Sequence, residues 1–393
     1  NNSYSLSYIR VLYAMWLVRT VLSYLLTYRK SLLIADQKEY IASITGLILN
    51  VVSYLAIILL VTWEQNYLLA LGIGTVTEVV LNIWISWYVE QKYPFLRQRR
   101  KEKSTSSLTK RIVRDLKSLF ISRISEKMLY CTDNLIISGF IGVGTVGRYA
   151  NYCMITQAIS NILTILANTI QPTVGDYFTE KNRQRNYEIL RQLTFGFFCI
   201  ASVVSVGLFS LITPFVRDIW LGPSYELGWG ITVFCIVVLL VRIMGLPLSL
   251  VMGVTGLFEK EKNVGASSAL LNLIVSLALV KPYGMAGVLL GTLLSYLLQI
   301  LYRYIIYFRD FLEMPGEALR YAQDIGEYLA VIAGEVLLMQ KIVPLIYGAG
   351  GMLLFCVCFL LCIAIPLLLD LVIFGRGWRL QSIVTMVKGM RKA

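Results

Sequence analysis

The chain has 393 residues, of which 57% are hydrophobic and only 15% are charged, with a formal net charge of +13 and a mean hydropathy of +0.69. Soluble globular chains carry about 25% charged residues, so the composition excludes an ordinary soluble domain. There is no histidine, which excludes histidine-based catalysis and histidine metal sites. No G-x-x-x-x-G-K-[ST] loop occurs, which excludes ATP hydrolysis by that route. The seven cysteines lie in or beside apolar runs, as small apolar residues do. We therefore expect no metal and no cofactor.

Apolar runs long enough to cross about 30 Å of hydrocarbon, about 18 residues or more, recur along the whole chain. Backbone polar groups in lipid must be satisfied within the segment, and no segment shows the alternation of a barrel strand, so helices remain. The sequence predicts an all-α, polytopic transmembrane bundle of about eleven spans. They are 4–28, 41–63, 67–90, 118–140, 148–171, 193–215, 230–256, 264–281, 284–306, 325–345 and 350–374.

The loops between these spans are alternately rich and poor in basic residues. One side collects 27 Lys and Arg, and the other only Arg148, Arg217, Lys281 and Lys341. Because cytoplasmic loops carry the excess of basic residues, we expect the C-terminus in the cytoplasm and the first residue outside. The loops on the poor side are short. The segment Lys92–Lys110 is polar, basic and serine-rich, and we interpret it as a linker between two bundles.

Several spans contain charged side chains, which are costly in a bilayer and by default suggest function. Arg19 lies in the first span, Glu78 in the third and Arg242 in the seventh, ahead of Pro247. Glu335 is central in the tenth, and Asp370 ends the eleventh. The fourth span carries Arg123, Glu126, Lys127 and Asp133. These four residues form either a structural ion-pair cluster or the lining of a polar cavity.

The fifth span carries a stripe of five polar side chains at alternating spacings of four and three residues. Such spacing places side chains on one face of a helix. The stripe either makes hydrogen bonds to neighbouring helices or lines a water-filled path. Its members are Gln157, Asn161, Thr164, Asn168 and Gln171. By contrast, Gly287 and Gly291 in the ninth span predict only close helix packing.

Four stretches of the sequence resemble a known family. Cys131–Gly142, continuing through Val146-Gly147-Arg148-Tyr149, combines an Asp, an apolar run, a Phe-Gly turn and Val-Gly-x-Tyr. SLLIADQKEY at Ser31–Tyr40, Trp220-Leu221-Gly222 with Tyr225, and Tyr283–Val288 also match in kind. Together they are similar to the bacterial polysaccharide flippases that move O-antigen or capsule repeat units, within the multidrug/oligosaccharidyl-lipid/polysaccharide exporter superfamily. The resemblance spans about residues 20 to 300.

This resemblance implies a two-lobed exporter-type fold of twelve to fourteen spans, here lacking the first three. Residues 1–91 would be the remainder of the N-terminal lobe, and 92–117 a basic cytoplasmic linker. Residues 118–306 would form the C-terminal lobe of six spans, and 307–393 an accessory pair of spans with a basic cytoplasmic tail. The location implied is the bacterial inner or plasma membrane.

The function implied is that of a flippase, not an enzyme, for cell-surface polysaccharides, including exopolysaccharides. Its partners would be lipid-linked oligosaccharide and membrane lipid, with a polysaccharide polymerase and glycosyltransferases in the same pathway, and no nucleic acid. It would move undecaprenyl-pyrophosphate-linked oligosaccharide repeat units from the inner to the outer leaflet by alternating access. Arg binds phosphate oxygens in a bidentate manner, and the expected pyrophosphate ligands are Arg19, Arg123, Lys127 and Arg242. The expected sugar ligands are Gln157, Asn161, Thr164 and Asn168.

Glu78 and Asp133 are the coupling-ion candidates in this interpretation. Two other functions stay open at this stage. A membrane polymerase or ligase of the same sugars would typically need a sizeable outer loop, and the outer loops here are short. A cation-coupled drug antiporter of the same superfamily would use intramembrane carboxylates such as Glu78 and Glu335.

Overall fold

The computed structural model describes residues 5–24, 27–36, 38–64, 67–97, 113, 120, 131–178, 182–348 and 350–375. It divides into two compact units, Asn1–Ser106 and Ser107–Ala393. We call them the N-terminal unit and the C-terminal unit and describe each by itself. In the described residues of both units, the regular structure is helical.

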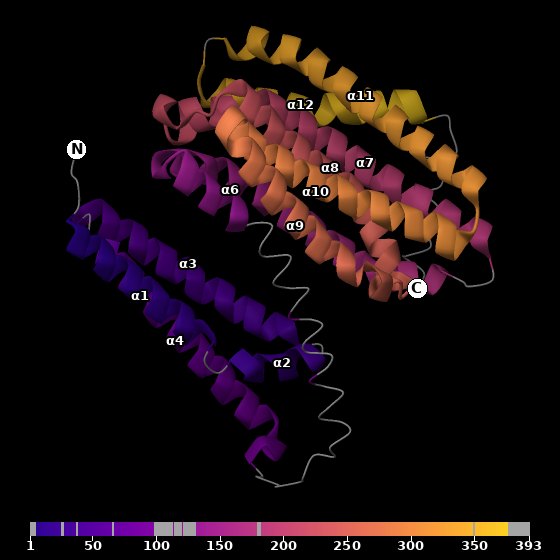
Figure 1. The fold of residues 1–393 in the computed structure, drawn as a ribbon. Coiled ribbons are helices and arrows are strands. Elements are labelled where there is room, and N and C mark those ends of the chain that lie inside the picture. Colours follow the sequence, from indigo (N-terminus) through magenta and orange to yellow (C-terminus); the bar gives the residue numbers. More distant parts are fainter. Residues whose placement is uncertain are drawn as a thin grey trace. The chain divides into compact units, whose positions relative to one another are not determined.

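In the N-terminal unit, α4 (Tyr67–Lys92) packs against α1 (Leu6–Tyr24), α2 (Thr27–Ala35) and α3 (Glu39–Glu64), and is followed by the short η1 (Pro94–Arg97). Figure 1 shows the three long helices side by side, with α2 near one end. Among the described residues of this unit, only a small group of apolar residues is buried, around Leu33, Ala42, Ile85 and Val89. Most of the apolar surface of this unit is therefore exposed, as lipid-facing helices require.

The described part of the C-terminal unit contains the helical segment 131–140 and seven long helices. They are α6 (Val143–Tyr177), α7 (Arg183–Pro214), α8 (Trp229–Val254), α9 (Phe258–Tyr283), α10 (Met285–Ile305), α11 (Pro315–Tyr347) and α12 (Met352–Phe374). Two π-helical turns, η2 (Phe215–Trp220) and η4 (Ile306–Leu312), continue α7 and α10, and the short η3 (Pro223–Tyr225) follows η2.

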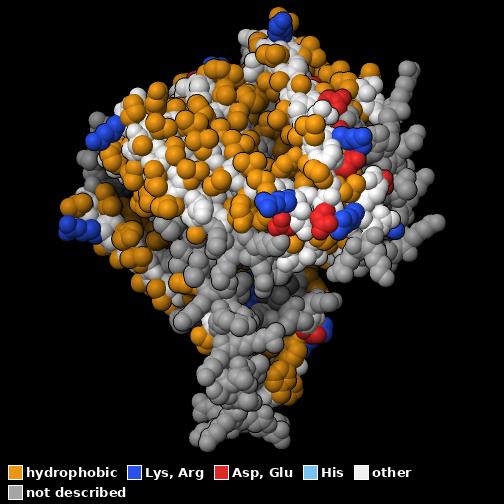
Figure 2. Space-filling model, turned by 45° about the vertical axis from the view of Figure 1, so that its right-hand side comes forward, with side chains coloured by type: hydrophobic (Ala, Val, Ile, Leu, Met, Phe, Trp, Pro, Cys, Tyr) orange, Lys and Arg blue, Asp and Glu red, His pale blue; other side chains and the backbone are white. Residues whose placement is uncertain are grey.

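Helix α7 lies at the centre of this unit and packs against α8, α11 and α12 (Figure 1). Large aromatic residues and small residues alternate on it, so that Phe195 and Phe198 are buried beside Ala201, Ser202 and Ser205. Small residues let membrane helices approach closely. On the face drawn in Figure 2, hydrophobic side chains predominate and the charged ones form small groups.

The helices agree with ten of the eleven predicted spans, and the described part of the fourth, residues 131–140, is helical. By length and hydropathy, nine described stretches can cross a membrane, and one of them, Val264–Leu312, includes most of α9 and all of α10. The chain is therefore a multi-pass membrane protein with about eleven spans. The rest of the fourth span, including Arg123, Glu126 and Lys127, lies outside the described residues.

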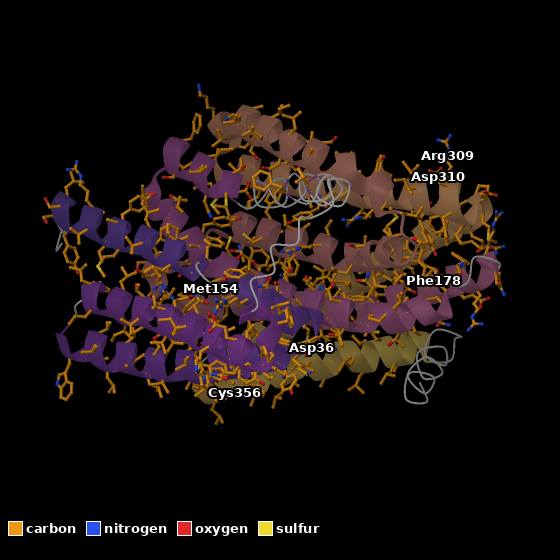
Figure 3. The ribbon with its side chains drawn as sticks, turned by 90° about the horizontal axis from the view of Figure 1, so that it is seen from below. Asp36, Met154, Phe178, Arg309, Asp310 and Cys356 are labelled. Carbon is orange, nitrogen blue, oxygen red and sulfur yellow. The ribbon has the colours of Figure 1, made fainter. Side chains whose placement is uncertain are left out.

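Contacts between loops of the C-terminal unit show which helix ends lie together. Arg183, at the start of α7, forms a 2.8 Å ion pair with Glu313, just before α11. Tyr347, at the end of α11, donates a 3.2 Å hydrogen bond to Asp218 in η2. In Figure 3, Phe178, Arg309 and Asp310 accordingly lie toward one end of the helices of this unit, and Cys356 lies toward the other. The basic segments 183–191 and 303–320, predicted to share a side, do share an end.

Candidate functional site

A cavity of about 70 Å³, lined by both polar and apolar side chains, opens within the C-terminal unit. It lies between the helical segment 131–140, α6, α8 and α10. Three of the residues singled out from the sequence line it, namely Asp133, Gln157 and Arg242. The other lining residues are Asn134, Tyr149, Cys153, Thr156, Cys235, Val238, Leu239, Leu289, Thr292 and Tyr296.

Asp133 is the acidic residue of this lining and is only 5% exposed. Thr292 of α10 donates a hydrogen bond of 2.7 Å to its Oδ2 atom, and Asn272 of α9 donates one of 3.4 Å to its Oδ1 atom. The Asn272 amide also donates a 2.9 Å hydrogen bond to the Thr292 hydroxyl. The Asn272 Oδ1 atom is buried and has no hydrogen-bond partner among the described residues. The three side chains thus concentrate oxygen atoms at one buried point.

Close packing of α9 against α10 brings Asn272 and Thr292 together. A Cβ atom on Gly287 would lie 2.3 Å from the Leu279 carbonyl oxygen, and one on Gly291 would lie 2.3 Å from the Ser276 hydroxyl. Only glycine fits at such a backbone approach. The turn between the helices also needs a glycine, since Gly284 has a φ of 58°, a left-handed conformation that L side chains rarely adopt. The prediction of close packing at Gly287 and Gly291 is confirmed.

Arg242 is the basic residue of the cavity lining and comes from the middle of α8. Its guanidinium lies over the ring of Tyr296, 5.9 Å from the ring centroid, within the range of a cation–π interaction. The cavity therefore presents a cationic side chain, a carboxyl group and several amide and hydroxyl groups to one space.

The polar stripe of the predicted fifth span lies on α6, along the border of its packed face. Gln157 lines the cavity, Asn161 and Asn168 are exposed within this unit, and Thr164 is half-buried. The Thr164 hydroxyl bonds to its own helix at the Ser160 carbonyl, 2.8 Å away. The neighbouring positions Ser160, Leu163 and Ala167 are buried. Asn161 and Asn168 are thus not sealed against another helix of this unit.

In the N-terminal unit, Arg19 and Glu78 form an ion pair with 3.8 Å between Nη2 and Oε1, and each side chain is a little over one third exposed. The Arg19 guanidinium lies directly over Gly74 of α4, where a Cβ atom would come within 2.8 Å of it. A second ion pair of 2.6 Å joins Arg29 to Glu90 near the other end of α4. The Arg19 guanidinium is therefore paired with a carboxylate of the protein, which is the alternative to pairing with an anionic ligand. Arg123 and Lys127 lie outside the described residues.

The sequence interpretation missed Asn272, Thr292, Tyr149 and Tyr296 as members of the cavity or its carboxyl cluster. A signal for Asn272 was present, because Ser268, Asn272 and Ser276 follow one another at four-residue intervals on an otherwise apolar span. All three are fully buried. A polar stripe that is buried against another helix resembles one that lines a cavity, so spacing alone does not separate the two.

The fold and this cavity together define a multi-pass helical membrane protein with a polar intramembrane site. Comparisons with known proteins narrow the class. Residues 2–178 match the sequence profile of the family described as polysaccharide biosynthesis protein. The structure of the lipid II flippase MurJ in an inward closed conformation matches 90% of this chain and 71% of its own, with 15% sequence identity and a TM-score of 0.64. No curated protein matches.

The structural likeness shows that the chain has a MurJ-like fold. The profile match covers residues 2–178, which include the Ser31–Tyr40 and Cys131–Tyr149 motifs that carry the sequence resemblance.

Proposed function

We propose that the protein moves undecaprenyl-pyrophosphate-linked oligosaccharide repeat units from the inner to the outer leaflet of a bacterial cell membrane. The movement would proceed by alternating access and would serve the synthesis of a capsule, O-antigen or exopolysaccharide. The observation that carries the proposal is the convergence of Arg242, Gln157 and Asp133 on one polar cavity inside a membrane-spanning unit.

Each of these residue types matches one part of such a substrate. A pyrophosphate needs cationic partners away from bulk water, and Arg242 supplies a fork of N–H donors suited to phosphate oxygens. Sugar hydroxyl groups need amide and hydroxyl partners, which Gln157, Asn161, Thr164 and Asn168 supply along α6. Arg19, Arg123 and Lys127 stay candidate pyrophosphate ligands, and Arg19 would have to exchange Glu78 for the substrate.

The isoprenoid tail would stay among the lipids. An open apolar groove of about 780 Å³ on the C-terminal unit offers a surface for it, between α8, α10 and α11. Its lining includes Leu248, Leu297, Leu301 and Ile325. A groove open to lipid fits a long apolar chain better than a closed pocket would.

Asp133 is the better placed of the two coupling-ion candidates. Its carboxyl group is buried with Asn272 and Thr292, and the Asn272 Oδ1 atom beside it has no partner among the described residues. Glu78, in contrast, already pairs with Arg19. We therefore place ion coupling at Asp133. The basic side chain in the cavity also favours an anionic substrate over the cationic substrate of a drug antiporter.

The domain roles stay part of this proposal, with 1–91 and 118–306 as the two moving lobes, 92–117 as the linker and 307–393 as accessory spans. The cytoplasmic C-terminus and the action of a polymerase and glycosyltransferases in the same pathway also stay part of this proposal.

The test is complementation of bacterial strains that each lack a single repeat-unit flippase. Restored surface polysaccharide supports the proposal. Failure in every strain despite normal membrane insertion, or drug resistance in place of polysaccharide, overturns it.

A further inference from the structure

Two buried carboxyl groups face each other across the interface of α7, α11 and α12, on helices other than those that hold Asp133. Glu335 of α11 and Asp370 of α12 are each 3% exposed, and Ser202 of α7 is fully buried between them. Ser202 donates a hydrogen bond of 2.6 Å to Glu335 Oε2. Helices α7, α11 and α12 all pack against one another, and the carboxyl groups of Glu335 and Asp370 lie within electrostatic range of each other.

Three oxygen atoms of this cluster have no hydrogen-bond partner among the described residues. They are Glu335 Oε1 and both carboxyl oxygens of Asp370. A buried polar atom left without a partner costs free energy, and in native proteins such an atom usually has an ion, a proton or a water as its partner. Asp370 in particular is buried, and neither of its carboxyl oxygens has a hydrogen-bond partner among the described residues.

Among the described residues, neither carboxyl group forms an ion pair with Lys or Arg. On α11, Lys341 lies six residues from Glu335 and is exposed. The nearest basic residue along α7, Arg191, pairs with Asp324 at 2.6 Å. Arg191 is eleven residues from Ser202, about 16 Å along a helix. The Cys199 thiol of α7 is an ionisable group in electrostatic range of both carboxyl groups.

The apolar layers on both sides close the site from water. On one side, one turn away on α7 and α12, Phe198 and Phe374 pack edge to face with ring centroids 5.5 Å apart. The layer on the other side lies one turn from the cluster on each of the three helices. It consists of the buried residues Val206 on α7, Met339 on α11 and Pro366 on α12. Two like charges in such an enclosure are strongly unfavourable unless a cation neutralises one of them.

We propose that Glu335, Asp370 and Ser202 form a binding site for one monovalent cation, a proton or Na⁺, that is separate from the Asp133 cluster. Either cation supplies the single positive charge that two adjoining carboxylates need. A divalent metal site would call for more ligands, and the described residues contain no group of three or more His, Cys, Asp or Glu side chains that could hold a metal. The site does not depend on the identity of the transported substrate.

The test measures cation uptake by the full chain in lipid nanodiscs. Bound ²²Na⁺ is counted at pH 7, and infrared difference spectra in H₂O and D₂O record protonated carboxyl groups. The variants are Glu335→Gln, Asp370→Asn and both together. Glu188→Gln, an exposed carboxylate on α7, is the matched control, and Asp133→Asn reports the other cluster.

If Na⁺ is the ligand, one equivalent of bound ²²Na⁺ is lost in the Glu335 and Asp370 variants and kept in Glu188→Gln. If a proton is the ligand, one protonated-carboxyl band disappears in the same variants while Na⁺ binding stays unchanged. Should the Glu335 and Asp370 variants misfold, the comparison of wild-type protein with Asp133→Asn decides the matter. A wild type with no protonated-carboxyl band, and with no bound Na⁺ beyond the equivalent that Asp133→Asn removes, overturns the proposal. Unchanged Na⁺ and unchanged bands in folded variants overturn it equally.

Discussion

The Thr292 hydroxyl on α10 donates a hydrogen bond of 2.7 Å to the Asp133 carboxyl group, and this bond joins residues that are 159 positions apart in the chain. We predict that Thr292→Val lowers the free energy of unfolding by about 1–3 kcal/mol, because a buried carboxyl group then loses a hydrogen bond. The measurement is thermal unfolding of purified protein. Thr169→Val is the matched control, since the Thr169 hydroxyl bonds only to its own helix at Ile165 in an exposed position. Equal stability of the two variants would contradict this role of Thr292.

The contact between α9 and α10 should not tolerate a methyl group at Gly287. We predict that Gly287→Ala destabilises the protein by about 1–3 kcal/mol, because the added Cβ would meet backbone atoms that cannot move aside. Gly207→Ala on α7 is the control, since a Cβ there has nothing within 4 Å. The readout is the fraction of protein that stays monodisperse after heating. A Gly287→Ala protein as heat-resistant as Gly207→Ala would show that the helices can separate without loss.

Arg191 and Asp324 form a two-fold hydrogen-bonded ion pair between α7 and α11, with distances of 2.6 and 3.0 Å. Their side chains are 21% and 10% exposed, whereas those of the Arg183–Glu313 pair are 49% and 57% exposed. We predict that Arg191→Gln costs about 3 kcal/mol, because it removes a positive charge and two hydrogen bonds from a largely buried carboxylate.

Arg183→Gln should cost about 0–1 kcal/mol, as exposed pairs do. Thermal unfolding of the two single variants at the same salt concentration makes the comparison. Similar losses for both would contradict the difference in burial.

Asp36, at the end of α2, forms ionic and hydrogen-bonded contacts outside the membrane spans. The pKa of its carboxyl group is lowered most by the Lys38 ammonium and next by the Tyr93 hydroxyl, each of which lies 2.5 Å from the carboxyl oxygen Oδ2. A lowered pKa in the folded state gives stability that is present above the unfolded-state pKa and is lost as the pH falls through the folded-state value.

We therefore expect hydrogen-exchange protection of residues 28–36 to fall on acidification, relative to the rest of the N-terminal unit. Asp36→Asn should remove this pH dependence. The prediction is wrong if the variant and the wild type lose protection in parallel.

The spans were predictable from the sequence because each helix that crosses a bilayer needs a long apolar run, so length and hydropathy mark each one. Asp133, Gln157 and Arg242 were also identifiable, since polar side chains are rare in such helices. The partners of these residues were not. Asn272 meets Asp133 only because Gly287 and Gly291 let α9 and α10 touch. The pairing of Arg19 with Glu78 likewise depends on how α1 rests on Gly74, and no local pattern encodes that register.

The role of Arg242 tests the flippase account most directly. Purified protein would be reconstituted into liposomes that contain a fluorescent undecaprenyl-pyrophosphate oligosaccharide, and a membrane-impermeant quencher would report how much of it has crossed. We predict transport by the wild type and by the control Arg309→Gln, because the Arg309 side chain is 83% exposed. In Arg242→Gln the transport rate should fall by about tenfold or more, since hydrogen bonds to charged groups contribute about 1.5–3 kcal/mol. Arg242→Lys should fall between them if the charge matters more than the fork of donors. Transport by Arg242→Gln at the wild-type rate, or none by the wild type with any lipid-linked oligosaccharide, would contradict the account.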